Sequence, residues 1–125
     1  MANYVAHLQP ELAVNYCRLV VAWVDDPAST RTARQELGAT FPFLCDHERK
    51  LIAELDIMDT SDARHPRIAI PYTFVLDAQR VIYRIYNGWW YVGRPTVEEL
   101  RMDLRALMSR RADWWYDDTR LPLGP

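Results

Sequence analysis

The two cysteines, Cys17 and Cys45, are the only side chains here that could supply a nucleophilic sulfur, and no Cys-x-x-Cys or Thr-x-x-Cys motif accompanies them. Cys45 precedes Asp46, which we expect to cap a helix, and a helix N-terminus favours the thiolate form of a nearby cysteine. Cys45 is therefore a candidate reactive thiol. The alternative is a small, partly buried packing residue beside Leu44, since free cysteines are among the most buried residues.

Cys17 precedes an apolar run and is expected to be a structural residue. A Cys17–Cys45 disulfide would require the start of that run to lie beside the chain around Cys45.

Other kinds of site have weaker support. His7, His47 and His65 do not share metal-ligand spacing with each other or with the cysteines, so no metal site is expected. His65 lies in a predicted loop, where it is either a solvated residue or part of a site. The sequence shows no Ser-His-Asp order and no carboxylate pair, and its 4 glycines leave no nucleotide-binding loop, so we expect no cofactor.

Length and charge narrow the class of protein. A chain of 125 residues fits a single domain, 1–125, in which residues 112–125 form a tail. The net charge of -2 gives no support for a nucleic-acid partner. No apolar stretch approaches the ~20 residues that span a bilayer and no secretory signal opens the chain, so we expect no membrane partner and a cytoplasmic location. There both cysteines should be reduced.

The first half of the chain predicts helix, strand and helix. Apolar residues at helical spacing predict a short amphipathic opening helix that breaks at Pro10, where a second turn starts. The run from Leu19 to Val24 has the length and composition of a strand buried on both faces of a sheet. Asp26 as N-cap and Pro27 at the first position start a surface helix that ends at Gly38.

The middle of the chain predicts a short extended segment, 41–44, and then a helix that Asp46 caps. The polar stretch 58–67 is expected to be a loop. Residues 72–76 and 81–86 are rich in β-branched and aromatic side chains and lie close together, which predicts a hairpin.

A closing helix is the most strongly patterned element. Thr96 and Glu99 have capping-box spacing, and an apolar stripe follows as far as Leu107. A buried strand of the parallel type, followed by a hairpin and a closing helix, predicts an α/β three-layer domain.

Four strings in this order resemble the peroxiredoxin-like (AhpC/TSA, redoxin) family of the thioredoxin fold. Val20 to Asp26 resembles the second core strand with its terminal acidic residue, Phe41 to Lys50 the segment usually written F-P-L-L-S-D with its basic helix, Thr73 to Asp77 the T-F-V-I-D strand, and Gly93 to Leu107 the closing G-R-P helix. The resemblance implies a thioredoxin-like three-layer sandwich and a family activity of thiol-dependent peroxide or disulfide reduction, an antioxidant oxidoreductase chemistry.

The same resemblance implies a role for Pro71. In thioredoxin folds a cis proline precedes the corresponding strand and faces the reactive cysteine, so we expect the Ile70–Pro71 bond to be cis. In typical peroxiredoxins this position is the arginine that stabilises the peroxidatic thiolate. Here it is Pro71, and Arg67 is near but does not align, so that contact is not carried over.

The start of the chain departs from the family pattern. The first core strand and the loop with the reactive cysteine precede the helix that matches residues 2–9, and neither occurs in this sequence. We therefore expect an N-terminally truncated member that is inactive alone, because no other residue replaces a thiol in attack on peroxide or disulfide. One alternative is a non-enzymatic interaction module or partner subunit, and another is residual thiol chemistry through Cys45.

Two features bear on partners. Trp89, Trp90 and Tyr91 could form an aromatic surface for association or could cover one end of the core. Without the first core strand, the strands at 19–24 and 72–76 should have a gap or an unusual direct pairing between them. Because unpaired strand edges recruit partners, we expect a homodimer or association with another chain that completes the sheet.

Overall fold

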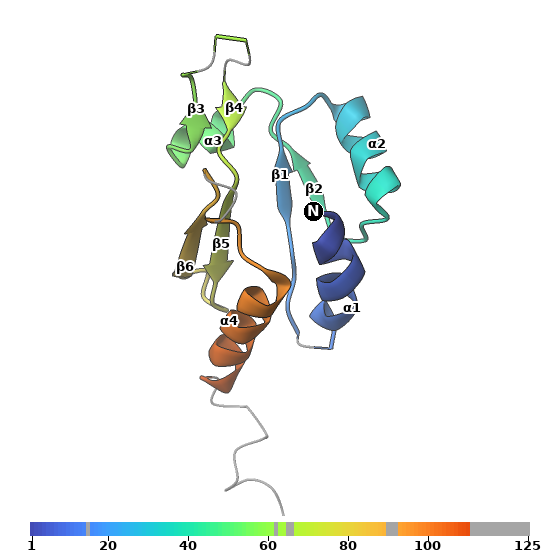
Figure 1. Ribbon diagram of the computed structural model, residues 1–125, viewed down its shortest axis with the longest axis vertical. Helices are drawn as coiled ribbons and strands as arrows, with labels where there is room; N and C mark the ends of the chain where they lie inside the picture. Colours follow the sequence, from blue (N-terminus) through green and yellow to red (C-terminus); the bar gives the residue numbers. More distant parts are fainter. Residues whose placement is uncertain (15, 62, 65–66, 90–92, 111–125) are drawn as a thin grey trace, which may run out of the picture.

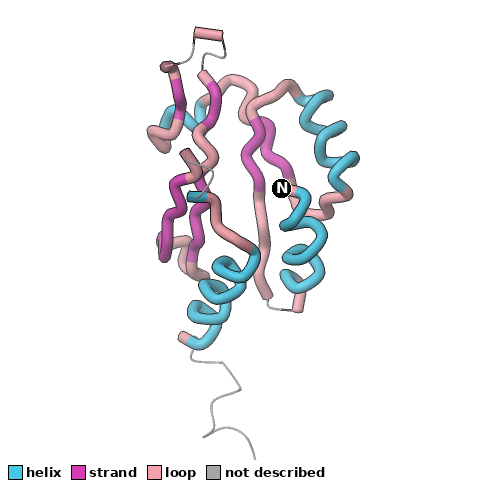
Figure 2. Tube along the Cα trace, viewed as in Figure 1, coloured by secondary structure: helices cyan, strands magenta, loops and turns pink. Residues whose placement is uncertain are grey.

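The protein alternates helices and short strands, as Figures 1 and 2 show. The structure is a computed structural model that describes residues 1–14, 16–61, 63–64, 67–89 and 93–110. In chain order the elements are η1 (Tyr4–Leu8), α1 (Gln9–Leu12), β1 (Val21–Trp23), α2 (Pro27–Leu37), β2 (Phe43–Cys45), α3 (Lys50–Glu54), β3 (Met58–Asp59), β4 (Ile68–Ala69), β5 (Tyr72–Leu76), β6 (Ile82–Asn87) and α4 (Val97–Ser109).

The opening helix continues through Pro10, so the expected break was wrong. Its first part, η1, is π-helical, and the amide of Gln9 donates to the carbonyl of Tyr4, five residues back. Pro10 lies in the first turn of α1. The wider π turn moves the hydrogen-bond pairing where a proline, with no N–H, would otherwise clash with the preceding turn.

β1 and β2 form a parallel pair in which Val21 lies opposite Phe43. β1 is shorter than the predicted strand, and it is not buried on both faces. Val21 is buried, whereas the side chain of Val20 is 52% exposed and Ala22 is also exposed. The apolar run was predicted to be buried on both faces of a sheet, but only the face of β1 that carries Val21 packs against a hydrophobic core.

The helix α2 has the predicted boundaries. The Asp26 carboxylate accepts the amide of Ser29 at 2.9 Å, Pro27 occupies the first turn, and Gly38 ends the helix at φ 68. Only Thr30 of this helix is buried, so its expected place on the surface is confirmed.

The next helix is shorter than predicted. The N-cap position of α3 is Arg49 and not Asp46, but the Asp46 carboxylate accepts the amides of Leu51 and Ile52 in the first turn at 3.1 and 3.0 Å. The loop predicted over 58–67 was wrong at its start, because β3 pairs antiparallel with β4. The partner strand β4 lies outside the polar stretch, so this pairing could not be predicted from the stretch alone.

The predicted hairpin is confirmed as the antiparallel pair β5 and β6, with an irregularity between Val75 and Leu76. In its turn, Oδ1 of Asp77 accepts the amides of Gln79 and Val81, both at 2.9 Å. Arg80 takes the left-handed conformation, φ 65, that a glycine would adopt at less cost.

The closing helix α4 begins with the predicted capping box between Thr96 and Glu99. It packs with the opening helix and the hairpin around one cluster of buried side chains: Leu8, Leu12, Val75 and Leu100. A second buried cluster lies beside β1 and consists of Val21, Ala39 and Phe41.

The strands do not form one continuous sheet. β1–β2, β3–β4 and β5–β6 are three separate two-stranded sheets among the described residues. In Figure 1, β1 and β5 are the inner strands, and β2 and β6 lie outside them. The predicted interruption between the strand after Cys17 and the hairpin is therefore present as a gap, not as a direct pairing.

Candidate functional site

Cys45 ends β2 and is exposed. Its sulfur donates a hydrogen bond to the backbone carbonyl of Asp25 at 3.1 Å. It also lines a shallow pocket of about 330 Å³ between β2 and α2, where Arg31 and Arg34 lie on the helix side. Arg34 donates to the carbonyls of Phe41 and Thr40, at 2.9 and 3.1 Å.

The N-terminus of α3, the helix that follows Cys45, binds the Asp46 side chain and not the Cys45 sulfur. The amides of Leu51 and Ile52, in the first turn of this helix, donate to the Asp46 carboxylate. The Cys45 sulfur instead donates its hydrogen bond to the backbone carbonyl of Asp25. This geometry differs from the helix-stabilised thiolate considered from the sequence.

Cys17 is half-buried and packs against the cluster around Leu8 and Leu100. Burial raises the pKa of the Cys17 thiol, because an apolar environment disfavours the thiolate. The Cys17 and Cys45 sulfurs are not bonded to each other, so the conceivable Cys17–Cys45 disulfide is not formed.

Pro71 was predicted to follow a cis peptide bond, and this was wrong: the Ile70–Pro71 bond is trans. The amide of Tyr72 donates to the carbonyl of Ile70 at 2.8 Å, which makes a three-residue turn centred on Pro71. The fixed φ of proline suits that turn without a cis bond. The Pro71 carbonyl accepts the amide of Gly88 at 2.9 Å.

The two residues singled out from the sequence have different hydrogen-bond partners: the Cys45 sulfur donates to the Asp25 carbonyl, and the Pro71 carbonyl accepts the amide of Gly88. His65, Trp90, Tyr91 and the tail 112–125 lie outside the described residues. Trp89 is described, and its side chain is 46% exposed.

Two other features are absent from the part of the chain that the structure describes. None of its helices is long and apolar enough to cross a membrane. It also holds no group of three or more His, Cys, Asp or Glu side chains arranged to bind a metal ion.

A polar cluster between β6 and α4, centred on the buried carboxylate of Asp103, was missed from the sequence. The Tyr86 hydroxyl donates to Oδ2 of Asp103 at 2.6 Å, and Arg84 pairs with Oδ1 of the same carboxylate at 3.2 Å. Burial, and then the hydrogen bond to Asp103, raise the pKa of Tyr86 to about 12. The sequence did contain a signal for a buried acidic residue. Asp103 falls three residues after Leu100, so it lies on the apolar face of the closing helix.

A larger hollow, of about 720 Å³, lies at one end of the gap between β1 and β5. Residues 16–18, which precede β1, form one wall, and residues 76–80, which end the hairpin strand, form the other. Leu104 and Leu107 of α4 contribute an apolar lining. Neither Cys45 nor Pro71 lines this hollow, and Cys17, which was predicted to be structural, does.

Residues 1–85, which run from the opening helix into β6, match the family model described as AhpC/TSA family. The chain belongs to the AhpC/TSA family. The resemblance seen in the sequence is thereby confirmed, and redoxin or peroxiredoxin ancestry follows from it.

A solved structure of Mycobacterium tuberculosis AhpC is similar to this AhpC/TSA chain, with a TM-score of 0.70 and 23% sequence identity. The match covers 89% of this chain and 61% of that protein, so the chain spans less than two thirds of the length of AhpC. The likeness shows the fold, and it confirms the predicted α/β, thioredoxin-like class. Curated protein sequences give no match.

Proposed function

We propose that this chain is a redoxin-fold protein that does not by itself reduce peroxides or disulfides, and that it works as a protein-binding subunit. Its ancestry is that of a family with thiol chemistry, and such chemistry requires an accessible, ionisable sulfur. The environment of the two cysteine sulfurs, Cys17 and Cys45, carries the proposal.

Neither sulfur has the surroundings of a reactive thiolate. Cys17 is half-buried among apolar side chains, and its pKa is raised. Cys45 is accessible, but its sulfur donates to the Asp25 carbonyl, and the nearby helix amides are bound by Asp46. A cytoplasmic location is part of the proposal, because free thiols persist in a reducing compartment.

Residual thiol chemistry at Cys45 is a second candidate, and one observation favours it. The exposed sulfur shares its pocket with Arg31, whose positive charge would stabilise a thiolate if the side chain turned toward it.

Peroxide consumption in the presence of dithiothreitol separates the two candidates. We expect wild type, Cys45→Ala and Cys17→Ala to match the rate of the reductant alone. A rate above that background which Cys45→Ala removes would overturn the proposal in favour of the second candidate. Mass spectrometry after peroxide and dimedone treatment reads the same chemistry directly, as a sulfenic acid adduct on Cys45.

A further inference from the structure

The pocket of about 330 Å³ beside Cys45 is formed by one short stretch of the chain. All of its lining residues lie between Pro27 and Cys45, in α2, in β2 and directly before β2. In Figure 1 these elements lie on the other side of β1 from the hairpin. The pocket is therefore shaped by α2 and β2, and the gap between β1 and β5 has no part in it.

One guanidinium of this pocket is held in place by neutral groups. Arg34 is half-buried, and it donates from Nε to the Phe41 carbonyl at 2.9 Å and from Nη2 to the Thr40 carbonyl at 3.1 Å. These carbonyl oxygens fix the orientation of the side chain but do not neutralise its charge. A guanidinium has five N–H donors, so Arg34 has donors left for a ligand.

A second guanidinium lies one turn earlier on the same helix. Arg31 is exposed and precedes Arg34 by three residues, a spacing that makes the two side chains neighbours on the helix surface. Two like charges at this spacing repel each other. Neither arginine forms an ion pair with a carboxylate among the described residues. A bound anion would relieve the repulsion between them.

No acidic side chain of the described residues lines the pocket. Three carboxylates lie next to the lining in sequence, and each has its own donors. Asp25 accepts the indole N–H of Trp23 at 2.8 Å, and Asp26 accepts the amide and the hydroxyl of Ser29 at 2.9 and 2.7 Å. Asp46 accepts two amides of α3, at 3.1 and 3.0 Å. The lining therefore offers positive charge without an internal counter-ion.

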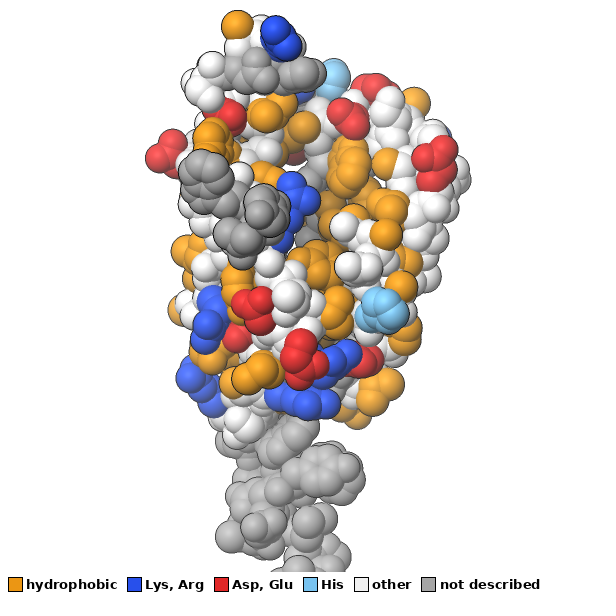
Figure 3. All heavy atoms as spheres, viewed as in Figure 1, with side chains coloured by type: hydrophobic (Ala, Val, Ile, Leu, Met, Phe, Trp, Pro, Cys, Tyr) orange, Lys and Arg blue, Asp and Glu red, His pale blue; other side chains and the backbone are white. Residues whose placement is uncertain are grey.

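The β2 side of the pocket is an apolar wall. Phe43 belongs to a stack of three rings, in which its centroid is 5.4 Å from that of Trp23 and 5.8 Å from that of Phe41. Pro42, next to it, is also part of the lining. Figure 3 shows hydrophobic side chains gathered between the β1–β2 pair and α2. Small-molecule sites combine such preformed apolar walls with a few polar groups that fix the orientation of the ligand.

The size and the two kinds of wall define the ligand. The volume is near the lower end of the range for small-molecule sites, roughly 300–1,000 Å³. An inorganic anion would satisfy the arginines and leave the apolar wall uncovered. We propose that this pocket binds a small organic acid, whose carboxylate contacts Arg31 and Arg34 and whose apolar body, about the size of one ring, covers Phe43. The inference goes beyond the proposed protein-binding role and does not depend on it.

Cys45 reports occupancy of the pocket, because its exposed sulfur is part of the lining. Benzoate should slow the alkylation of Cys45 by N-ethylmaleimide, a neutral reagent, in the full chain. Benzamide, an uncharged analogue of the same size, should protect Cys45 far less. Mass spectrometry of the digested protein follows Cys45 and, in the same sample, Cys17, which lies outside this pocket and should react at an unchanged rate.

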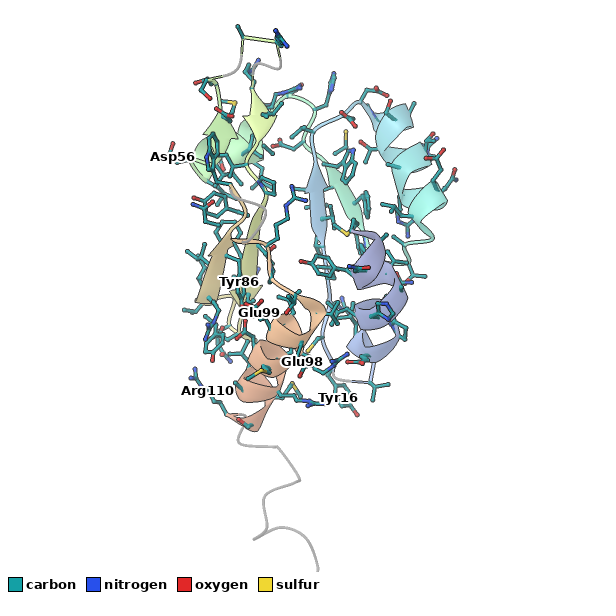
Figure 4. All side chains as sticks on the ribbon, viewed as in Figure 1. Tyr16, Asp56, Tyr86, Glu98, Glu99 and Arg110 are labelled. Carbon is teal, nitrogen blue, oxygen red and sulfur yellow. The ribbon has the colours of Figure 1, made fainter. Side chains whose placement is uncertain are left out.

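Charge variants test the contact with the arginines. Arg31→Gln should weaken benzoate binding by about fivefold, which corresponds to the ~1 kcal/mol of an exposed ion pair. Arg31→Lys keeps the charge and should retain most of the affinity. The matched control is Arg105→Gln, at an exposed position of α4, which should bind as wild type does. Figure 4 labels Glu98 and Glu99 on that helix, across the molecule from α2. Circular dichroism establishes that each variant is folded.

Four outcomes would overturn the inference. Cys45 could react at the same rate with and without benzoate, or Arg31→Gln could bind benzoate as tightly as wild type does. Equal protection by benzamide would assign the effect to the apolar wall alone, and equal protection by inorganic phosphate at matched ionic strength would assign the site to an inorganic anion. Peroxide turnover by the chain would overturn the proposed lack of catalysis and leave these readouts unaffected.

Discussion

The hydroxyl of Tyr86 on β6 donates a 2.6 Å hydrogen bond to the carboxylate of Asp103 on α4. Asp103 is only 5% exposed, so the bond satisfies a charge that water barely reaches. Arg84 holds the other oxygen of the same carboxylate. The closing helix is thereby fixed to the hairpin by polar contacts as well as by its apolar stripe.

Replacing Tyr86 by Phe should lower the free energy of unfolding by about 1–2 kcal/mol, because one oxygen of a buried carboxylate loses its donor. Urea denaturation at neutral pH measures the change. Tyr72→Phe is the matched control, since no hydrogen bond of the Tyr72 hydroxyl to a described residue is present. Equal losses in the two variants would contradict a special role for the Tyr86–Asp103 bond.

The same contact predicts a loss of stability in alkali. The pKa of Tyr86 is about 12 in the folded protein and near 10 in the unfolded chain. Because the folded-state pKa is raised, its contribution is complete below pH 10 and is lost as the pH rises toward 12. Urea midpoints across this range should therefore fall more steeply for wild type than for Tyr86→Phe. Parallel curves would show that Tyr86 does not titrate abnormally.

An ion pair between α1 and α4 predicts that the protein also loses stability in acid, as the pH falls. Arg101 of α4 donates from Nε and Nη2 to the two oxygens of Glu11 on α1, both at 2.8 Å. The hydrogen bond to Arg101 lowers the pKa of Glu11 below its ordinary value of 4.5. The stabilisation is therefore present above pH 4.5 and is lost as the pH falls through the lowered folded-state value.

Glu11→Gln should accordingly be less stable than wild type at neutral pH, and the difference should shrink in thermal melts below pH 4.5. Glu36→Gln serves as the control, because Glu36 is an exposed residue of α2. A difference between wild type and Glu11→Gln that stays constant down to strongly acidic pH would exclude the ion pair as its source.

The capping box of α4 supplies a fourth prediction. The Thr96 side chain accepts the amide of Glu99 at 3.1 Å, and Glu99 in turn accepts the amide of Thr96 at 3.2 Å. Thr96→Ala removes one half of this exchange and should cost about 1 kcal/mol of stability. Thr32→Ala, an exposed threonine inside α2, should be neutral or stabilising, since alanine is the better helix former. Chemical denaturation of both variants compares them.

Sequence reasoning succeeded where the determinants are neighbours in the chain. Asp26 and Gly38 bound α2, and Thr96 starts α4, because a cap depends on the few residues around it. It failed where the detailed hydrogen bonding decides. Pro10 is accommodated by a local π turn, and the Pro71 carbonyl accepts the amide of Gly88, which directly follows β6.

The same limit applies to the candidate site. Cys45 could be recognised as an accessible thiol beside a capping aspartate, and both features are present. The group that its sulfur contacts, the Asp25 carbonyl, belongs to the segment after β1, and no local pattern predicts it. Asp103 was overlooked because an acidic residue in a helix normally faces solvent.

Gly88 provides a strict test of the backbone around Pro71. A Cβ at Gly88 would lie 2.2 Å from the Pro71 carbonyl oxygen and 3.0 Å from the Arg94 side chain. The oxygen is a backbone atom that accepts the Gly88 amide, so it cannot move aside without breaking the ladder at the start of the hairpin. Gly88→Ala should therefore destabilise the protein by about 1–3 kcal/mol, the usual cost of overpacking. Gly38→Ala is a useful comparison, because nothing lies within 4 Å of its Cβ position and its cost comes from the positive φ alone. If urea denaturation showed Gly88→Ala to be as stable as wild type, the close approach of these two backbone segments would be disproved.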